Sequence, residues 1–545
     1  MRFVPLALAT LCLLVFFIGL DRIAATDWRE ARDAEVAREL VSRREILAPI
    51  YAYEPLFEKP ILGYAPEVVA RLLDPRTPLR SRQIRGGLAV ALILLTASIG
   101  ARHFGMRAAW LSALVLGSSL ALPFAARADG TQLLATLLGW VTCAGLADVA
   151  FGRSAGRDLR LVVTYGALGA VLVCAGPLPA LWPLGGLLLY TALARTPGVW
   201  ERARPVAGLL LAAGMAVPWY GAMIERYGAD FLAHAPFFPY AVETRVSWFS
   251  GALFAPSFLV TGFFPWCALL PGAMLHAATG WRERRLPEIF GRTVGIAGAD
   301  PVSREVREES AAHFFIAALF AALAPIAIYP GAPLTAVLPA LPAAALLVGR
   351  FLDHLFETPE RLASPLTRAV LMLALLGTVA ALLLAMTGGR LRDPAPQLRQ
   401  IATLLFVTSW APFLADFLGR RRLAAGLLAL PVALGTPVAS MALLPAMEDW
   451  LNTRQVAEAA ATVMPPHSPL ITAGSPPPSL RLFTARNLVP SDSVATDARR
   501  FPAADGHAYV AFRPARERAV AQELATPLEI LLRTPTLILA RVREP

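Results

Sequence analysis

Cysteine is scarce in this 545-residue sequence, and its few copies are scattered. The four cysteines lie inside apolar runs, far apart and without the C-x-x-C spacing of zinc or redox sites: Cys12, Cys143, Cys174 and Cys267. Disulfide frameworks and zinc sites rely on closely and regularly spaced cysteines. Neither is therefore expected to organise this chain.

A concentrated basic patch is missing as well. The formal net charge is +11, but the basic residues are spread over short segments between apolar stretches, without interleaved aromatic residues. Nucleic-acid-binding surfaces gather their basic residues on one face, whereas this distribution is typical of loops beside a membrane. The sequence therefore predicts membrane lipids, and no nucleic acid, as partners.

Lysine is nearly absent. Lys59 is the only lysine among 50 basic residues, and all the others are arginine. An ammonium group is a compact point charge on a flexible stem, whereas a guanidinium is a rigid planar fork. The single exception indicates that an ammonium is needed at position 59.

Apolar residues are abundant, at 56% of the chain with a mean hydropathy of +0.55, against roughly 45–50% in soluble domains. A membrane-spanning helix needs about 17 to 25 apolar residues. Thirteen stretches are predicted to span the membrane: residues 4–20, 86–100, 106–124, 131–150, 161–174, 178–194, 205–223, 252–278, 314–328, 332–348, 369–386, 401–418 and 423–444. The first lacks an A-x-A cleavage site and is expected to remain as a helix.

The distribution of arginine over the loops predicts how these spans are oriented in the membrane. Alternate loops are arginine-rich, near residues 102–107, 153–160, 195–204, 282–285, 350–368 and 420–422. Because positive side chains resist transfer out of the cytoplasm, these loops and the N-terminus are expected to be cytoplasmic. Residues 21–85, residues 225–250 and the chain after residue 444 then lie outside.

The C-terminal part has a different character. Short β-rich runs at residues 469–472, 507–512 and 536–542 alternate with helical patterns at 453–463 and 515–524, which predicts a small α/β domain. The predicted fold is an all-α polytopic membrane domain at 1–447, with about 13 transmembrane helices and the outer loop 21–85. A small extracytoplasmic α/β domain at 448–545 follows.

The outer loop 21–85 carries the most distinctive pattern. Residues 28–40 read WREARDAEVAREL, with one apolar and one charged helical face, as in a helix lying in the membrane interface. The motif FEKP follows at residues 57–60, and a second amphipathic pattern covers residues 66–73. The predicted order is interfacial helix, turn containing Lys59, interfacial helix.

This loop resembles the first outer loop of the C-type glycosyltransferase superfamily, in the branch of protein O-mannosyltransferases and lipid A aminoarabinose transferases. That branch reads approximately DEARYAEIAREM and then FEKPPLGYW. Other similar stretches are RAD at 127–129, TGFFPW at 261–266, VLPALP at 337–342 and PSLRLF at 478–483. The resemblance implies an enzyme of the bacterial inner membrane, an inverting hexosyl- or pentosyltransferase. It would move a sugar from polyprenyl phosphate to a lipid, glycan or protein on the outer face.

Such a transfer needs a carboxylate for the acceptor's proton and cations for the departing phosphate, and an apolar groove for the isoprenoid. Lys59 is predicted to bind the phosphate, as the resemblance also implies; the alternative is a lysine that reaches from apolar surface to water. For Glu58 the resemblance implies a role in ordering the site or in a divalent metal site, with a simple salt bridge as the alternative. No cofactor is otherwise implied.

Arg29 occupies the position of the family's catalytic aspartate, which leaves Glu30 at the second acidic position. Glu30 is the predicted base, with Asp33 or Asp27 replacing it if the helix is rotated or shifted by one residue. The alternative is a solvated helix face with ion pairs such as Arg29 with Asp33. The departure at Arg29 also supports a second hypothesis, a non-catalytic relative that binds polyprenyl-phosphate lipids or supports envelope assembly.

Three further residues are candidates. Arg245, in the second outer loop, is implied by the resemblance to bind the donor phosphate, with a solvated arginine as the alternative. The resemblance implies that Asp129 with Arg127 supports the catalytic carboxylate; alternatively, Asp129 caps the helix that begins at Gly130. A transporter is disfavoured, because the sequence shows neither broken, inverted halves nor ionisable groups at mid-membrane.

Overall fold

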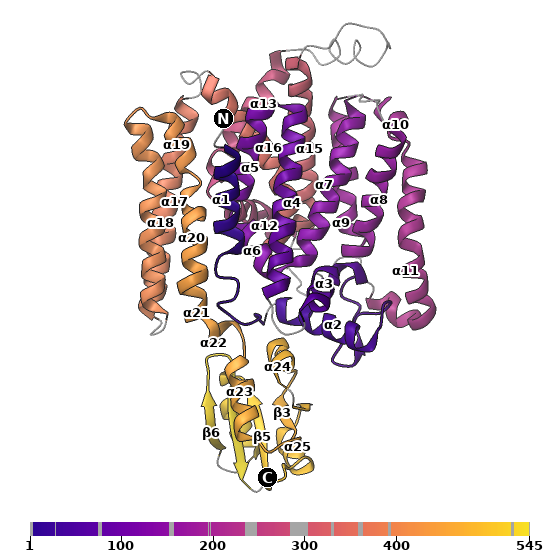
Figure 1. Cartoon of the computed structure of the whole chain (residues 1–545), viewed down its shortest axis with the longest axis vertical. Helices are drawn as coiled ribbons and strands as arrows, with labels where there is room; N and C mark the ends of the chain where they lie inside the picture. Colours follow the sequence, from indigo (N-terminus) through magenta and orange to yellow (C-terminus); the bar gives the residue numbers. More distant parts are fainter. Residues whose placement is uncertain are drawn as a thin grey trace.

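The protein is described from a computed structural model of the whole chain, in which a bundle of long helices carries a small sheet domain at one end (Figure 1). The described residues are 4–27, 29–74, 79–151, 157–194, 196, 198–234, 248–283, 304–328, 332–357, 363–390, 394–484, 486–524 and 528–543. The start of the first helix and the sheet domain lie at opposite ends of the bundle.

In these residues, ten helical segments are long and apolar enough to cross a membrane. They lie in α4 (Leu79–His103), α7 (Gly130–Ala150), α8 (Arg157–Ala175), α9 (Pro177–Ala194), α11 (Pro205–His234), α15 (Arg304–Ile328), η3 with α16 (Leu334–Ala340, Leu341–Glu357), α17 (Ala363–Arg390), α18 (Ala395–Phe417), and the run α19, α20, η4 and α21 (Arg421–Leu427, Leu430–Val438, Ala439–Leu443, Leu444–Ala446). An eleventh crossing results if α5 (Met106–Gly117) and α6 (Ala121–Ala128), bent by 57°, form one span.

The predicted polytopic helical fold is therefore confirmed, but the count of thirteen is not. The first expected span is α1 (Val4–Phe17), whose 14 residues are fewer than a bilayer crossing needs. The expected span at residues 252–278 is divided into α12 (Trp248–Gly262), η2 (Trp266–Ala268) and α13 (Leu270–Glu283). Its apolar sequence continues through the break, so hydropathy alone does not reveal it.

Two glycines allow close contacts with α8. A Cβ at Gly63 of η1 (Ile61–Tyr64) would lie 2.5 Å from the carbonyl oxygen of Cys174, and one at Gly145 in α7 would lie 1.8 Å from Oγ1 of Thr164. Small residues at helix contacts let membrane helices approach closely. The Gly63 contact holds η1 against α8 next to the turn that contains Lys59, whereas the Gly145 contact joins α7 and α8 further along the bundle.

The outer loop forms the predicted succession of helix, turn and helix. It comprises α2 (Arg29–Arg43), the antiparallel pair β1 (Ile50–Tyr51) and β2 (Glu54–Pro55), η1 (Ile61–Tyr64) and α3 (Ala65–Leu73). Both helices lie at the end of the bundle that carries the sheet domain (Figure 1), whereas the short α10 (Gly198–Ala203) lies at the other end.

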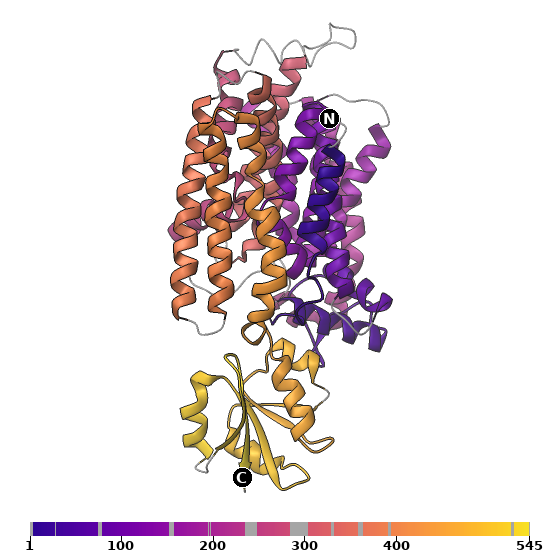
Figure 2. The same cartoon turned by 60° about the vertical axis from the view of Figure 1, so that its left-hand side comes forward.

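After α22 (Glu448–Leu451), a five-stranded sheet has helices on both faces (Figure 2). The strands β4 (Leu488–Ser491), β3 (Leu470–Ala473) and β5 (His507–Phe512) are parallel, and β7 (Ile538–Arg543) pairs antiparallel with β5 and β6 (Leu528–Arg533). The helical elements are α23 (Arg454–Val463), α24 (Pro478–Phe483), α25 (Val494–Arg500), η5 (Pro514–Arg516) and α26 (Glu517–Leu524).

Successive side chains of β5 point to opposite faces of the sheet, and each face has its own hydrophobic core. Tyr509 packs toward the core that includes Val456 of α23, whereas Val510 packs toward the core that includes Val494 of α25. The three β-rich runs of the sequence are confirmed as β3, β5 and β7. Strands β4 and β6 were missed because both are edge strands and β4 contains Pro490.

Candidate functional site

Lys59 lies buried in the turn between β2 and η1, with 3% of its surface exposed. Its Nζ donates hydrogen bonds to Oδ2 of Asp33 at 2.6 Å and to Oγ1 of Thr131 at 2.6 Å. It also lies 4.2 Å from the centre of the Tyr64 ring. An ammonium has three N–H donors, so two hydroxyl or carboxylate oxygens and one ring face surround it. The alternative of a lysine that extends to water is wrong.

Asp33 on α2 is buried with Lys59. Burial raises the pKa of Asp33 to about 6, although the nearby Lys59 ammonium opposes this increase. The charged face predicted for this helix is not solvated, since Glu30 is buried too. An amphipathic pattern is usually interpreted with its charged face toward water. In this protein the charged face of α2 instead packs against oppositely charged groups inside the protein.

Glu30 is held by two arginines from α4. Nε and Nη2 of Arg82 donate to its two carboxylate oxygens at 2.7 Å each, and Nη2 of Arg85 donates to Oε1 at 2.5 Å. The backbone N–H of Thr26 donates to Oε2 at 3.1 Å. Burial by itself raises the pKa of Glu30, but Arg82 and Arg85 outweigh it and lower the pKa to about 2. These contacts suit an anchor between α2 and α4 and argue against the predicted role as a base.

Nη1 of Arg85 also donates to Glu67 of α3 at 2.9 Å. We name these six residues the buried charge cluster: Glu30, Asp33, Lys59, Glu67, Arg82 and Arg85. The sequence analysis did not single out Arg82 or Arg85. Their signal was that they stand at the end of a span that the arginine pattern predicts to be outside, against the usual preference of arginine for cytoplasmic ends.

Asp129 caps α7, because its side chain accepts a hydrogen bond from the backbone N–H of Gln132 at 3.0 Å. Its other oxygen accepts a hydrogen bond from Oγ1 of Thr335 at 2.8 Å and lies 3.5 Å from Nη1 of Arg29. The capping prediction is confirmed. The residue that Asp129 contacts on α2 is Arg29, at the position where the family has its aspartate, so a supporting role for Asp129 stays a prediction.

Arg127 does not join the buried charge cluster. Its guanidinium donates to the backbone carbonyls of Val15 at 3.0 Å, Pro123 at 3.2 Å and Ile18 at 3.3 Å. It therefore fastens the end of α1 to α6.

Glu58 forms a salt bridge with Arg32 at 3.0 Å, with 32% and 36% of the two side chains exposed. In the part of the chain that the structure describes, no group of three or more His, Cys, Asp or Glu side chains is arranged as metal ligands. The described residues around Glu58 therefore do not fit a metal site. Arg245 lies outside the described residues.

A cavity of about 620 Å³ opens beside the turn that contains Lys59. We call it the interfacial groove. Its lining is mostly apolar and comes from α2, η1, α3, α8, α11 and the segment after α2: Leu40, Val41, Arg44, Glu45, Ile46, Ile61, Leu62, Ala65, Val68, Leu72, Ala170, Val173 and Met215. A long apolar chain could lie there while its polar end meets the residues before Ile61.

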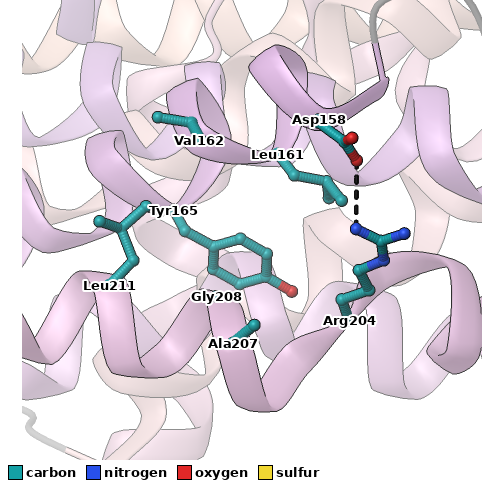
Figure 3. A pocket seen from close by; sticks show the side chains of 8 residues that line it. All are labelled: Asp158, Leu161, Val162, Tyr165, Arg204, Ala207, Gly208 and Leu211. Carbon is teal, nitrogen blue, oxygen red and sulfur yellow. Dashed lines mark hydrogen bonds and ion pairs between the residues drawn. The ribbon is translucent and has the colours of Figure 1, made fainter.

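A second cavity, of about 170 Å³, lies between α8 and α11 (Figure 3). Asp158 and Arg204 form a 3.1 Å ion pair at its rim, with 81% and 55% of their side chains exposed. Tyr165 donates its hydroxyl hydrogen to the carbonyl of Ala203 at 2.9 Å. This cavity is small and its charged residues are exposed. It therefore lacks both the buried ion pair and the larger apolar cavity found near Lys59.

The C-terminal domain holds the start of α2. The backbone N–H of Asp27 donates to the carbonyl of Leu451 at 2.7 Å, and the backbone N–H of Ser479 donates to Oδ1 of Asp27 at 2.7 Å. The guanidinium of Arg481 lies 5.7 Å from the centre of the Tyr51 ring. The PSLRLF motif, which forms α24, thus contacts the outer loop. Asp27, considered above as a replacement base, takes part in this docking.

The chain is similar in sequence to one curated transferase. It is 28% identical over 331 residues to the undecaprenyl phosphate-alpha-4-amino-4-deoxy-L-arabinose arabinosyl transferase 1 of Sodalis glossinidius (strain morsitans). The match covers 52% of this chain and 51% of the relative, so the chain spans about half the length of that relative. No family model matches the chain.

Two solved structures share the fold over nearly the whole chain. They are crystal structures of ArnT from Cupriavidus metallidurans, one bound to undecaprenyl phosphate with a TM-score of 0.77 and one in the apo state with 0.75. Both are 19% identical and cover 98% of this chain and 97% of theirs. The resemblance to the lipid A aminoarabinose transferase branch is confirmed, and the structural likeness establishes the fold.

Proposed function

We propose that this chain, which resembles the lipid A aminoarabinose transferase branch of the C-type glycosyltransferases, is a membrane glycosyltransferase whose donor is a polyprenyl-phosphate-linked sugar. The observation that carries the proposal is Lys59, a buried lysine two residues before Ile61, which lines the apolar interfacial groove. A polyprenyl phosphate combines an anionic headgroup with a long apolar chain. The Sodalis glossinidius relative is named for undecaprenyl phosphate, and one of the two ArnT crystal structures is bound to it, which supports the same donor class.

We assign the phosphate to Lys59, with Arg245 as a second cation, and the isoprenoid chain to the interfacial groove. The transfer is inverting, from a hexose or pentose donor to a lipid, glycan or protein. It takes place on the outer face of the bacterial inner membrane, with the N-terminus in the cytoplasm. The arginine-rich alternate loops support this orientation, as does the separation of the start of α1 from the C-terminal domain (Figure 1).

Of the two carboxylates predicted to act in catalysis, Asp33 is better suited to exchange a proton. A group exchanges protons most effectively when its pKa lies near the working pH. The pKa of Asp33 is about 6, whereas that of Glu30 is about 2. We therefore assign proton exchange beside Lys59 and the donor's phosphate to Asp33, and the anchoring of α2 to Glu30.

One observation favours the alternative function, a non-catalytic relative that binds polyprenyl-phosphate lipids or supports envelope assembly. Arg29 stands at the aspartate position and contacts Asp129, so an acidic group of the family pattern is replaced by a cation. Lipid binding without release of sugar from any lipid-linked donor would favour this alternative. Sugar release in isolated membranes would favour the enzyme.

Filling the interfacial groove tests the assignment of the isoprenoid chain. We expect Ala170→Trp to weaken binding of undecaprenyl phosphate to the purified protein in lipid nanodiscs by about tenfold or more, because the indole occupies space that the chain needs. Leu210→Trp is the matched control, because Leu210 lies on the same bundle, is 69% exposed and does not line the groove. Equal affinities for the two variants would contradict the assignment.

A further inference from the structure

The ammonium of Lys59 is already surrounded by side chains of the protein. Asp33 and Thr131 accept its hydrogen bonds at 2.6 Å, and the Tyr64 ring lies against it. Thr131 is itself fixed, because its hydroxyl donates to the carbonyl of Gly63 at 2.8 Å. A phosphate oxygen that reaches Lys59 must therefore take the place of one partner, and Asp33 is the partner that carries negative charge.

The buried charge cluster is also balanced. Its three carboxylates face three cations. Arg82 is committed to Glu30 and to the carbonyls of Leu20, Ile23 and Ala24. An additional anion therefore brings excess negative charge into a buried place, where an unpaired charge is strongly disfavoured. Uptake of one proton restores the balance.

We propose that Asp33 and the donor's phosphate compete for Lys59, and that Asp33 takes up a proton when the phosphate displaces its carboxylate. Donor binding and proton uptake are then one event. This inference rests on the proposed function, since it names how the donor's phosphate is accommodated at the same site.

The surroundings of Asp33 favour this proton uptake. Lys59, from the turn, favours the charged carboxylate, as does the Arg85 guanidinium from α4, whereas Glu67 from α3 and Glu58 disfavour it. The Lys59 ammonium is the main group that lowers the pKa of Asp33 against the effect of burial. Once a phosphate binds to Lys59, the ammonium is shared with this second anion and stabilises the Asp33 carboxylate less. The pKa of Asp33, already raised to about 6 by burial, then rises further.

Tyr64 adds an independent observation. Its side chain is fully buried, and its hydroxyl has no hydrogen-bond partner in the part of the chain that the structure describes. Burial holds the pKa of Tyr64 well above its usual value, so this hydroxyl stays a neutral donor. A buried donor without a partner is costly, and a phosphate oxygen at Lys59 would satisfy it.

This arrangement assigns Asp33 to the phosphate and not to the acceptor. In an inverting transfer the acceptor attacks from the face of the sugar opposite the leaving phosphate, whereas Asp33 lies against the ammonium that holds that phosphate. As the acceptor oxygen bonds to the sugar carbon, the bond from that carbon to the phosphate oxygen breaks. The phosphate oxygen keeps the electron pair and gains negative charge, and the acceptor's proton passes to solvent. The proton on Asp33 then donates a hydrogen bond to the departing phosphate.

The test compares binding of undecaprenyl phosphate in nanodiscs at pH 5.5 and 7.5 for the wild type, Asp33→Asn and Thr131→Val. Coupled uptake of one proton weakens binding by up to about tenfold per pH unit above the pKa of the free group. We expect the wild type to lose about tenfold more affinity across this range than Asp33→Asn, whose residual change reports the titration of the ligand itself. At pH 7.5, Asp33→Asn is expected to bind about tenfold more tightly than the wild type.

Thr131→Val is expected to bind more weakly at both pH values but to keep the pH dependence of the wild type. Calorimetry of the wild type in two buffers of different ionisation enthalpy measures the proton uptake without any substitution. Equal pH dependence in the wild type and Asp33→Asn, or no proton uptake beyond that of the ligand, would overturn the inference and leave the proposed function standing. Absence of binding by the wild type would instead overturn the proposed function.

Discussion

Replacing Lys59 with methionine is expected to lower sugar transfer by about 100-fold or more, a loss comparable to removing a preorganised electrostatic stabiliser from other active sites. Methionine preserves much of the length and apolar volume of lysine but removes the only lysine ammonium in the sequence. The measurement is transfer from lipid-linked sugars, extracted from the native cells, in membranes of a deletion strain that carries the variant.

The double variant Lys59→Met with Asp33→Asn separates this loss from misfolding. In the single variant Asp33 loses its partner at 2.6 Å, whereas the double variant leaves no buried carboxylate unpaired at that position. We expect the double variant to accumulate to the wild-type level and to remain inactive. Transfer near the wild-type rate in either variant would remove Lys59 from the mechanism.

Replacing Glu30 with glutamine is expected to cost about 3–5 kcal/mol of folding free energy, because it leaves the buried Arg82 guanidinium without its counter-charge and Arg85 with Glu67 as its remaining carboxylate partner. Arg82 and Arg85 are both nearly inaccessible to solvent. We expect a large fall in the thermal midpoint of unfolding of the detergent-solubilised protein and poor accumulation in membranes. Because the pKa of Glu30 in the folded protein is depressed to about 2, its stabilisation is full above its unfolded pKa of about 4.3 and is lost as the pH falls toward 2.

Asp158→Asn provides the matched control for Glu30→Gln. It also breaks an ion pair of the helical bundle, with Arg204, but both side chains are mostly exposed (Figure 3). Exposed pairs contribute at most about 1 kcal/mol, so the midpoint should change little. If Glu30→Gln instead accumulated normally and lost transfer activity, Glu30 would have a chemical role, as the sequence alone suggested.

Composition and motif spacing were enough to identify the outer loop and Lys59. A single lysine among arginines is visible without any structure, and the amphipathic patterns at residues 28–40 and 66–73 correspond to α2 (Arg29–Arg43) and α3 (Ala65–Leu73). The partners within the loop were not predictable. Which face of α2 meets α4 depends on tertiary packing, so the sequence did not reveal that Arg82 would bind Glu30.

The same limit explains the errors in the membrane domain. Hydropathy measures the apolar content of a linear segment, so it joined α12 and α13 across a break and extended the first apolar stretch to residue 20, beyond the end of α1 at Phe17. The sequence also left a solvated charged face of α2 open as an alternative. That face is buried because α3, α4 and the Lys59 turn supply opposite charges, which local periodicity does not record.

Photolabelling with a polyprenyl phosphate that carries a photoreactive group on its isoprenoid chain tests the central claim most directly. After irradiation of membranes, peptide mass spectrometry locates the attached label. We predict labelling of the interfacial groove, at residues 61–72 and 170–173, with loss of the label when undecaprenyl phosphate competes or when Lys59 is replaced with methionine. Labelling confined to the cavity between α8 and α11, or labelling unaffected by that substitution, would contradict the account.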